Sequence, residues 1–244
     1  MNSLSASMML RVWERALGRT SPERALALLA AACPELSAEE LSALNVGRRD
    51  RLLIDLRERT FGPRLTSLAT CDSCGESLEL SFDCSDISAE GETQTPAELS
   101  IEREGYEARF RLPNSGDLIA VARSGDADSA RRSLLERCVT EAVRDGSRVS
   151  PVELPATVVE AVEARMADAD PQADVRLALD CPACGHNFLA AFDVVAYFWS
   201  EINAWAYRLL GEVHTLASAY GWREEEILAL SPWRRRVYLE MVGG

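Results

Sequence analysis

Apolar residues in the first 60 positions recur every three or four residues, which is the spacing that gives an α-helix one apolar face. Ser21-Pro22-Glu23 should begin a helix, because proline is favoured at the first helical position, and Pro34 should end it. Ser37-Ala38-Glu39-Glu40 has the pattern of a capping box, and a longer helix is expected over residues 47–60. The apolar face of the first expected helix consists of Met8, Met9, Val12, Trp13 and Leu17.

Strict alternation of apolar and polar residues, the pattern of a β-strand, replaces the helical period on both sides of Cys71-Asp72-Ser73-Cys74-Gly75. Alternating residues also precede Cys181-Pro182-Ala183-Cys184-Gly185, and Phe188 and Phe192 follow that turn. Each Cys-x-x-Cys-Gly turn is therefore expected to join two strands.

The residues between these two turns make a stretch of the size of a small domain. It begins with a polar segment at 84–97, whose composition is typical of a linker, and continues with a hairpin over 101–112. Three helices should follow, over residues 114–121, 126–143 and 155–169.

The last part of the chain carries the longest helical pattern. Apolar residues step by three or four from Val195 to Tyr220, where Gly221 can supply a left-handed C-terminal cap. A short helix over 223–230 and a last helix over 233–242 are expected to follow.

These elements predict an α+β fold that is mainly α-helical. Helical N- and C-terminal regions should surround a small four-cysteine zinc-ribbon β element, which is split by an inserted α+β subdomain. The expected regions are an N-terminal helical region at 1–64, the first ribbon half at 65–84, the insert at 85–174, the second ribbon half at 175–192 and a C-terminal helical region at 193–244.

Composition narrows the classes of function. The chain has 244 residues, with 39 acidic against 26 basic residues and a net charge of −13. An acidic chain is poorly suited to bind a nucleic acid or an anionic membrane surface. No run of about 18 apolar residues indicates a membrane span, and the first residues lack the order of a secretory signal, so we expect a cytoplasmic protein.

The four cysteines of the two turns, Cys71, Cys74, Cys181 and Cys184, are the candidate metal ligands. Two residues between cysteines allow both thiolates to face one ion, and four thiolates suit tetrahedral zinc. We expect one structural Zn²⁺ per chain, tying the base of the insert. A degenerate, metal-free site, a redox dithiol and a catalytic zinc are the alternatives, although four thiolates leave no open position for water at a catalytic ion. His186 either competes as a ligand or is a solvated turn residue.

No catalytic constellation is evident, because the chain has only two histidines and no nucleophile with an obvious base. We therefore expect neither an enzyme nor a small-molecule substrate. A partner-binding surface is the other candidate, since tryptophan and arginine dominate protein interfaces; ordinary core packing and a solvated helix face are the alternatives. Its candidate residues are Trp222, Trp233, Arg234, Arg235, Arg236 and Tyr238.

Several ordered motifs together resemble a known family. They include the two cysteine turns, Ser115-Gly116-Asp117-Leu118, Asp170-Pro171-Gln172-Ala173, and the closing Ser231-Pro232 followed by Arg234-Arg235-Arg236. In these motifs the chain is similar to the baseplate protein family of T-even-type contractile phages, which is found in contractile-injection and prophage tail clusters.

The resemblance implies a non-enzymatic structural or assembly component of a contractile phage tail-like injection system. Its partners would be other baseplate, hub or tail proteins. It would be assembled in the cytoplasm, either staying in the particle or acting only during assembly. The alternative function is a cytoplasmic zinc-ribbon adaptor that binds an unrelated protein.

Overall fold

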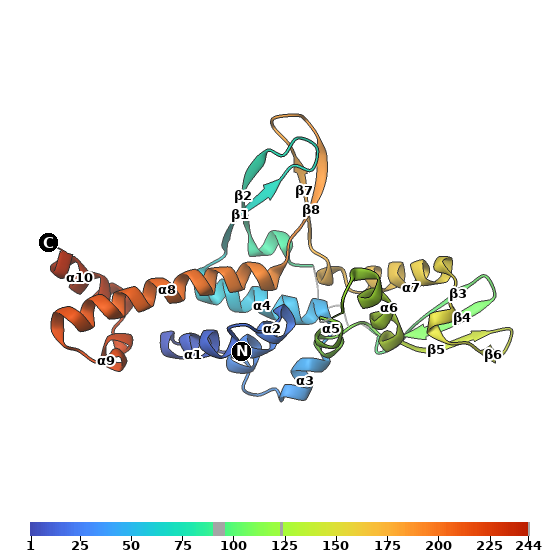
Figure 1. Cartoon of the computed structure of the whole chain (residues 1–244), viewed down its shortest axis with the longest axis horizontal. Coiled ribbons are helices and arrows are strands. Elements are labelled where there is room, and N and C mark those ends of the chain that lie inside the picture. The colour runs from blue at the N-terminus through green and yellow to red at the C-terminus, as the bar shows by residue number, and fades with distance from the viewer. Residues whose placement is uncertain (90–95, 123, 244) are drawn as a thin grey trace.

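The computed structural model describes residues 1–89, 96–122 and 124–243, and its fold is α+β and mainly helical (Figure 1). A helical body lies at the centre, a narrow β-ribbon projects from it, the insert extends to one side, and a C-terminal arm extends to the other (Figure 1).

The helical body combines the start and the end of the chain. It consists of α1 (Ala6–Ala16), α2 (Ser21–Ala32), α3 (Ala38–Ala43), α4 (Val46–Phe61) and the first half of α8 (Val194–Tyr220). Leu29 of α2, Leu53 of α4 and Ile202 of α8 are fully buried in one core. Each such side chain contributes about 1.5–3 kcal/mol by leaving water. The body is therefore stable only when α8 packs against the N-terminal helices.

The ribbon consists of two antiparallel hairpins that form separate two-stranded sheets. In the first hairpin β1 (Arg64–Thr70) pairs with β2 (Ser77–Asp83), and in the second β7 (Arg176–Asp180) pairs with β8 (Asn187–Ala191). Every second residue of each hairpin is more buried, as expected for two sheets that cover one face of each other.

The insert has its own four-stranded antiparallel sheet and its own core. The strand order is β3 (Leu99–Arg103), β4 (Tyr106–Phe110), β5 (Val139–Arg144) and β6 (Ser147–Arg148). The helices are α5 (Ser115–Val121), α6 (Ala127–Cys138) and α7 (Ala156–Ala169). Phe110, Val158 and Val162 are fully buried in this second core.

Three sequence-based expectations need correction. The helix expected over 126–143 ends at Cys138, because the β-branched run that begins with Val139 pairs with β4 instead. Leu17 lies beyond α1 and is exposed, and the inward face of α1 is formed by residues such as Leu10 and Trp13. The expected linker begins with a 3₁₀ helix, Cys84–Ile87, while its positions 90–95 lie outside the described residues.

The insert is joined to the body at the N-terminus of α4. The carboxylate of Asp170 accepts a hydrogen bond from the backbone amide of Gly47 at 2.9 Å. A helix N-terminus favours a negative charge, so Asp170 caps α4 from 123 positions away. Two segments connect the insert to the rest of the chain, one before it and one after it. Gln172 of the second segment links them, because its side chain forms hydrogen bonds with the backbone of Ile87 and of Ala89 in the first.

The C-terminal arm, which we define as residues 210–243, extends beyond the body on the second half of α8 (Figure 1). Gly221 ends α8 in the left-handed conformation, with φ of +68°. The chain then turns back through α9 (Glu224–Ala229) and α10 (Pro232–Gly243), which pack on α8 around the fully buried Leu216 and Ile227. Among the described helices, none is both long enough and apolar enough to cross a bilayer.

Candidate metal centre

The four cysteines of the two turns meet at one point. Their Sγ atoms all lie within 4.8 Å of one another. The Sγ atoms of Cys71 and Cys184 are 3.8 Å apart, and those of Cys74 and Cys181 are 3.6 Å apart. The structure thus brings together four side chains from turns that are separated by more than a hundred positions.

The two turns have the same backbone geometry. The amide of Gly75 bonds the carbonyl of Cys71 at 2.9 Å, and the amide of Gly185 bonds the carbonyl of Cys181 at 2.8 Å. Both glycines have a positive φ, +76° and +72°, although a Cβ would meet nothing within 4 Å. Glycine is therefore favoured here for its left-handed backbone and not for lack of space. This turn aims both cysteines of each hairpin at the same point.

Two of the six distances between the sulfur atoms are those of a tetrahedral zinc site, and all six lie within 4.8 Å. Zinc bound at about 2.3 Å to four thiolates separates neighbouring sulfurs by about 3.8 Å, which agrees with the two separations above. A disulfide needs a sulfur–sulfur distance of about 2.05 Å, so neither pair is bonded. The donor set can therefore hold one metal ion, and its all-sulfur chemistry suits zinc.

The surroundings of the thiols lower the pKa of one of them, Cys181, and so favour its thiolate form even without a bound metal. Burial raises the pKa of Cys181, but hydrogen bonds from the backbone amides of Cys184 and Ala183 and contacts with two thiols lower it to about 7. The amide of Glu76 lowers the pKa of Cys74, whereas the thiols of Cys184 and Cys181 raise it to about 12. The thiols of the cluster have different pKa values because neighbouring thiolates repel each other. A bound divalent cation would remove that repulsion.

His186 lies beside the cluster and outside it. Its Nε2 atom is 2.9 Å from the Asp72 carboxylate of the other turn, and its ring stacks on Phe188. The residues whose ligand atoms converge within the described chain are the four cysteines. His186 and Asp72 therefore connect the two turns next to the ligands.

The cluster is at the far end of the ribbon from the insert, which corrects the expectation that a metal would tie the base of the insert. Cys71 and Cys181 follow the last residues of β1 and β7, so both turns form hairpin tips (Figure 1). Seven residues of β1 span about 20 Å between tip and body. The metal would hold together the tips of two hairpins that share no hydrogen-bonded strand pairing.

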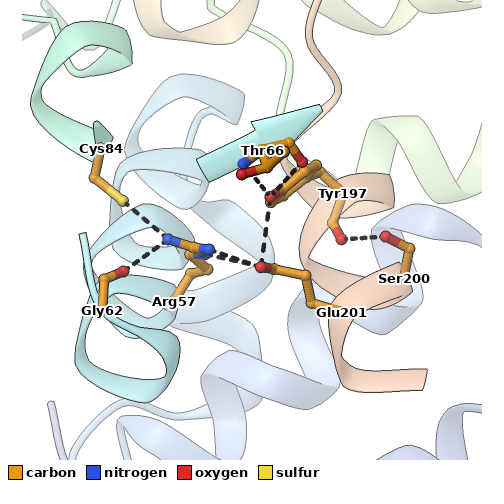
Figure 2. A network of polar contacts seen from close by, with 7 residues as sticks. All are labelled: Arg57, Gly62, Thr66, Cys84, Tyr197, Ser200 and Glu201. Atoms are coloured by element: carbon orange, nitrogen blue, oxygen red, sulfur yellow. Dashed lines mark hydrogen bonds and ion pairs between the residues drawn. The ribbon is translucent and has the colours of Figure 1, made fainter. Parts of the chain in front are cut away.

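A polar network that the sequence analysis missed fixes the base of the ribbon instead (Figure 2). Arg57 of α4 is 5% exposed and makes a bidentate ion pair with Glu201 of α8, at 2.8 and 2.6 Å. The same guanidinium donates to the carbonyl of Gly62 at 2.7 Å, directly before β1. Tyr197 of α8 accepts a hydrogen bond from the backbone amide of Thr66 in β1 at 3.0 Å.

The electrostatics of this network favour a permanently charged arginine. Burial lowers the pKa of Arg57, but its hydrogen bond and charge interaction with Glu201 raise it overall above its ordinary value. One signal in the sequence could have identified the residue, because Arg57 lies four positions after Leu53, on the apolar face of its helix. Its partner Glu201, 144 positions away, has no comparable local signal.

The remaining cysteines are core residues. Cys33, Cys84 and Cys138 are buried, and burial raises the pKa of each thiol, that of Cys138 to about 11. Thiols with raised pKa values are poor nucleophiles and poor metal ligands.

The six candidate partner-binding residues lie together in the C-terminal arm but differ in exposure. Arg235 is buried and pairs with Glu212 of α8 at 2.9 Å. Trp222 and Tyr238 are partly buried and pack against each other, with ring centroids 4.9 Å apart. Trp233, Arg234 and Arg236 are exposed.

Comparison with known proteins gives one match. Residues 19–199 match the family described as T4 bacteriophage base plate protein. The matched part includes both cysteine turns, the insert and the start of α8, and it ends before the C-terminal arm. No curated protein and no solved structure matches the chain.

Proposed function

Since the chain belongs to the T4 bacteriophage base plate protein family, we propose that it is a non-enzymatic structural or assembly component of the baseplate of a contractile phage tail-like injection system. The observation that carries this proposal is the family match, which covers the ribbon, the insert and the body except for α1 and the part of α8 after residue 199. The role requires surfaces that contact other baseplate, hub or tail proteins, and the projecting ribbon and insert provide long, accessible ones (Figure 1).

The metal in this proposal is one structural Zn²⁺ per chain, bound by Cys71, Cys74, Cys181 and Cys184. Four converging thiolates and sulfur separations near 3.8 Å support zinc over a harder ion. The bound ion would supply a rigid crosslink and no catalysis, because four sulfurs complete its coordination. The chain's own part is to present the thiolates, which the two glycine-containing turns and the Asp72–His186 contact do.

The place of action in this proposal is the cytoplasm, where the particle assembles, and the protein either stays in the particle or acts only during assembly. The C-terminal arm, with Trp222, Trp233, Arg234, Arg235, Arg236 and Tyr238, is its proposed partner-binding region. Arg235 would act from within, because its ion pair with Glu212 holds α10 against α8.

Deletion and complementation in a cell that expresses the whole injection gene cluster test the proposal. Without the gene, sheathed particles should be absent or lack their baseplate, and a tagged wild-type copy should restore them. Gradient fractions analysed by mass spectrometry then show whether the tagged chain sediments with assembly intermediates or with finished particles. The baseplate role would be refuted if the deletion strain made normal particles and the tagged chain of the complemented strain were found neither in assembly intermediates nor in finished particles. The alternative function, a zinc-ribbon adaptor that binds an unrelated protein, would then remain.

A further inference from the structure

The last helix, α10, packs on α8 with one side and carries apolar residues on the opposite side. Its inward side carries Arg235 and Leu239, which pack on α8. At 100° per residue, Trp233, Val237 and Met241 fall within an arc of about 80° on the opposite side. Trp233 is 70% exposed and Met241 is 65% exposed, whereas Val237 between them is partly buried. The two ends of this stripe are therefore open to a partner. We call these three residues the outer stripe.

Exposed tryptophan and methionine at one stripe are unusual on an acidic, water-soluble surface and typical of a contact surface. The arm projects away from the body, so a partner can approach α10 without meeting the ribbon or the insert (Figure 1). Val237 takes no part in the small core around Leu216 and Ile227. The outer stripe is therefore not needed for the fold of the arm.

The outer stripe is complementary to itself. Trp233 and Met241 each lie four positions from Val237, one on either side. If two α10 helices pack antiparallel about Val237, Trp233 of each copy lies against Met241 of the other, and a thioether contact with an aromatic ring is favourable. A closed two-fold interface requires this property, because both copies use the same patch.

The two charged residues beside the outer stripe, Arg236 and Glu240, also suit a two-fold contact. Arg236 and Glu240 lie on one edge of it, about one turn apart, and neither makes an ion pair with another described residue. The antiparallel arrangement brings Arg236 of each copy within reach of Glu240 of the other, which gives two ion pairs. A partner with a uniformly acidic surface would satisfy the arginine and leave the glutamate opposed by like charge.

We propose that the outer stripe binds a second copy of this chain, through an antiparallel two-fold contact of the α10 helices centred on Val237. One face of a 12-residue helix buries less area than a permanent dimer interface. The association is accordingly reversible, and low salt strengthens it through the Arg236–Glu240 pairs. The inference stands on α10 alone and does not depend on the role in the particle.

Sedimentation velocity of the purified full-length chain at low salt, from about 1 to about 200 µM, tests the inference in the range where small interfaces associate. Wild type should pass from monomer to dimer. Val237→Glu places two like charges on the symmetry axis and should raise the dissociation constant by at least about a hundredfold. Leu68→Glu, at an exposed leucine of the ribbon, is the matched control and should dimerise as wild type does.

A charge exchange identifies the geometry. Arg236→Glu and Glu240→Arg should each raise the dissociation constant about tenfold or more, since each creates two like-charge contacts. An equimolar mixture of the two variants should dimerise again, because both contacts then join opposite charges. A wild-type chain that stays monomeric throughout, a Val237→Glu variant that still dimerises, or a mixture that does not recover would each overturn the proposal. Circular dichroism confirms that each variant retains its helices.

Discussion

Loss of one metal ligand should unfold the tip of the ribbon and leave the helical body intact. Cys181→Ser removes a buried thiolate, and three thiolates bind zinc far more weakly than four. Without the ion, the tip depends on the small cluster of Leu78, Leu80 and Phe188, of which the last two are only partly buried. Their burial contributes about 4 kcal/mol, whereas structural zinc contributes about 10 kcal/mol or more. A bound zinc ion would therefore be the main source of stability at the tip.

The body has an independent source of stability, because its core contains no residue of the tip cluster. Hydrogen exchange with mass spectrometry separates the two regions. Peptides over 68–79 and 178–189 should lose protection in Cys181→Ser, while α4 and α8 keep theirs. Elemental analysis should find one zinc per wild-type chain and almost none in the variant. Cys33→Ala, which removes a buried cysteine outside the cluster, should retain the zinc.

Two results would contradict this reasoning. Simultaneous loss of protection in α4 and α8 would mean that the metal stabilises the whole fold. Full protection of both tips in a zinc-free variant would mean that the ion does not stabilise the tips, and a zinc-free wild type would mean that the cysteine cluster is not a metal site.

Three other perturbations have defined outcomes. Arg57→Met should lower the free energy of unfolding by about 3 kcal/mol in urea titrations, because it leaves Glu201 and the Gly62 carbonyl without their partner; the further change Glu201→Leu should recover part of that loss, and strictly additive effects would contradict direct coupling. Gly47→Ala should lower it by about 2 kcal/mol, since the new Cβ would overlap Asp170; unchanged stability would show that the joint between body and insert yields easily. Asp117→Asn tests the pH dependence of stability. Burial raises the pKa of Asp117, but Arg111 and Arg137 lower it overall. The carboxylate therefore stabilises the fold at pH values above its ordinary pKa of about 3.9, and this contribution is lost as the pH falls through the pKa of the folded state. The stability difference between wild type and variant should therefore shrink on acidification, and a constant difference would refute the assignment.

Local patterns predicted most of the secondary structure and the four cysteines that converge. The capping box at Ser37, the left-handed Gly221 and the two Cys-x-x-Cys-Gly turns all depend on residues within a few positions of one another. The boundary between α6 and β5 could not be predicted in the same way. Val139 and Thr140 continue a helical pattern in the sequence, and only pairing with β4 makes them a strand.

The candidate site also has features that local sequence predicts and features that depend on distant contacts. The sequence spacing predicts that the four cysteines converge, but their position at the ribbon tip depends on how the hairpins leave the body. The network at the ribbon base joins α4 to α8 across 144 positions and could not be inferred from either helix alone. Arg57 is recognisable as a charge on an apolar face; the identity of its partner is not.

The amino-acid sequence by itself determined the helices, the two hairpin turns, the four-thiolate donor set and the resemblance to a baseplate family, because each is encoded in short-range spacing. The tertiary structure alone decided that α8 completes the N-terminal core, that Asp170 caps α4, and that Trp233 and Met241 of α10 stay exposed. Contacts between distant segments depend on which surfaces fit after the whole chain has collapsed, and no short stretch of sequence specifies that fit.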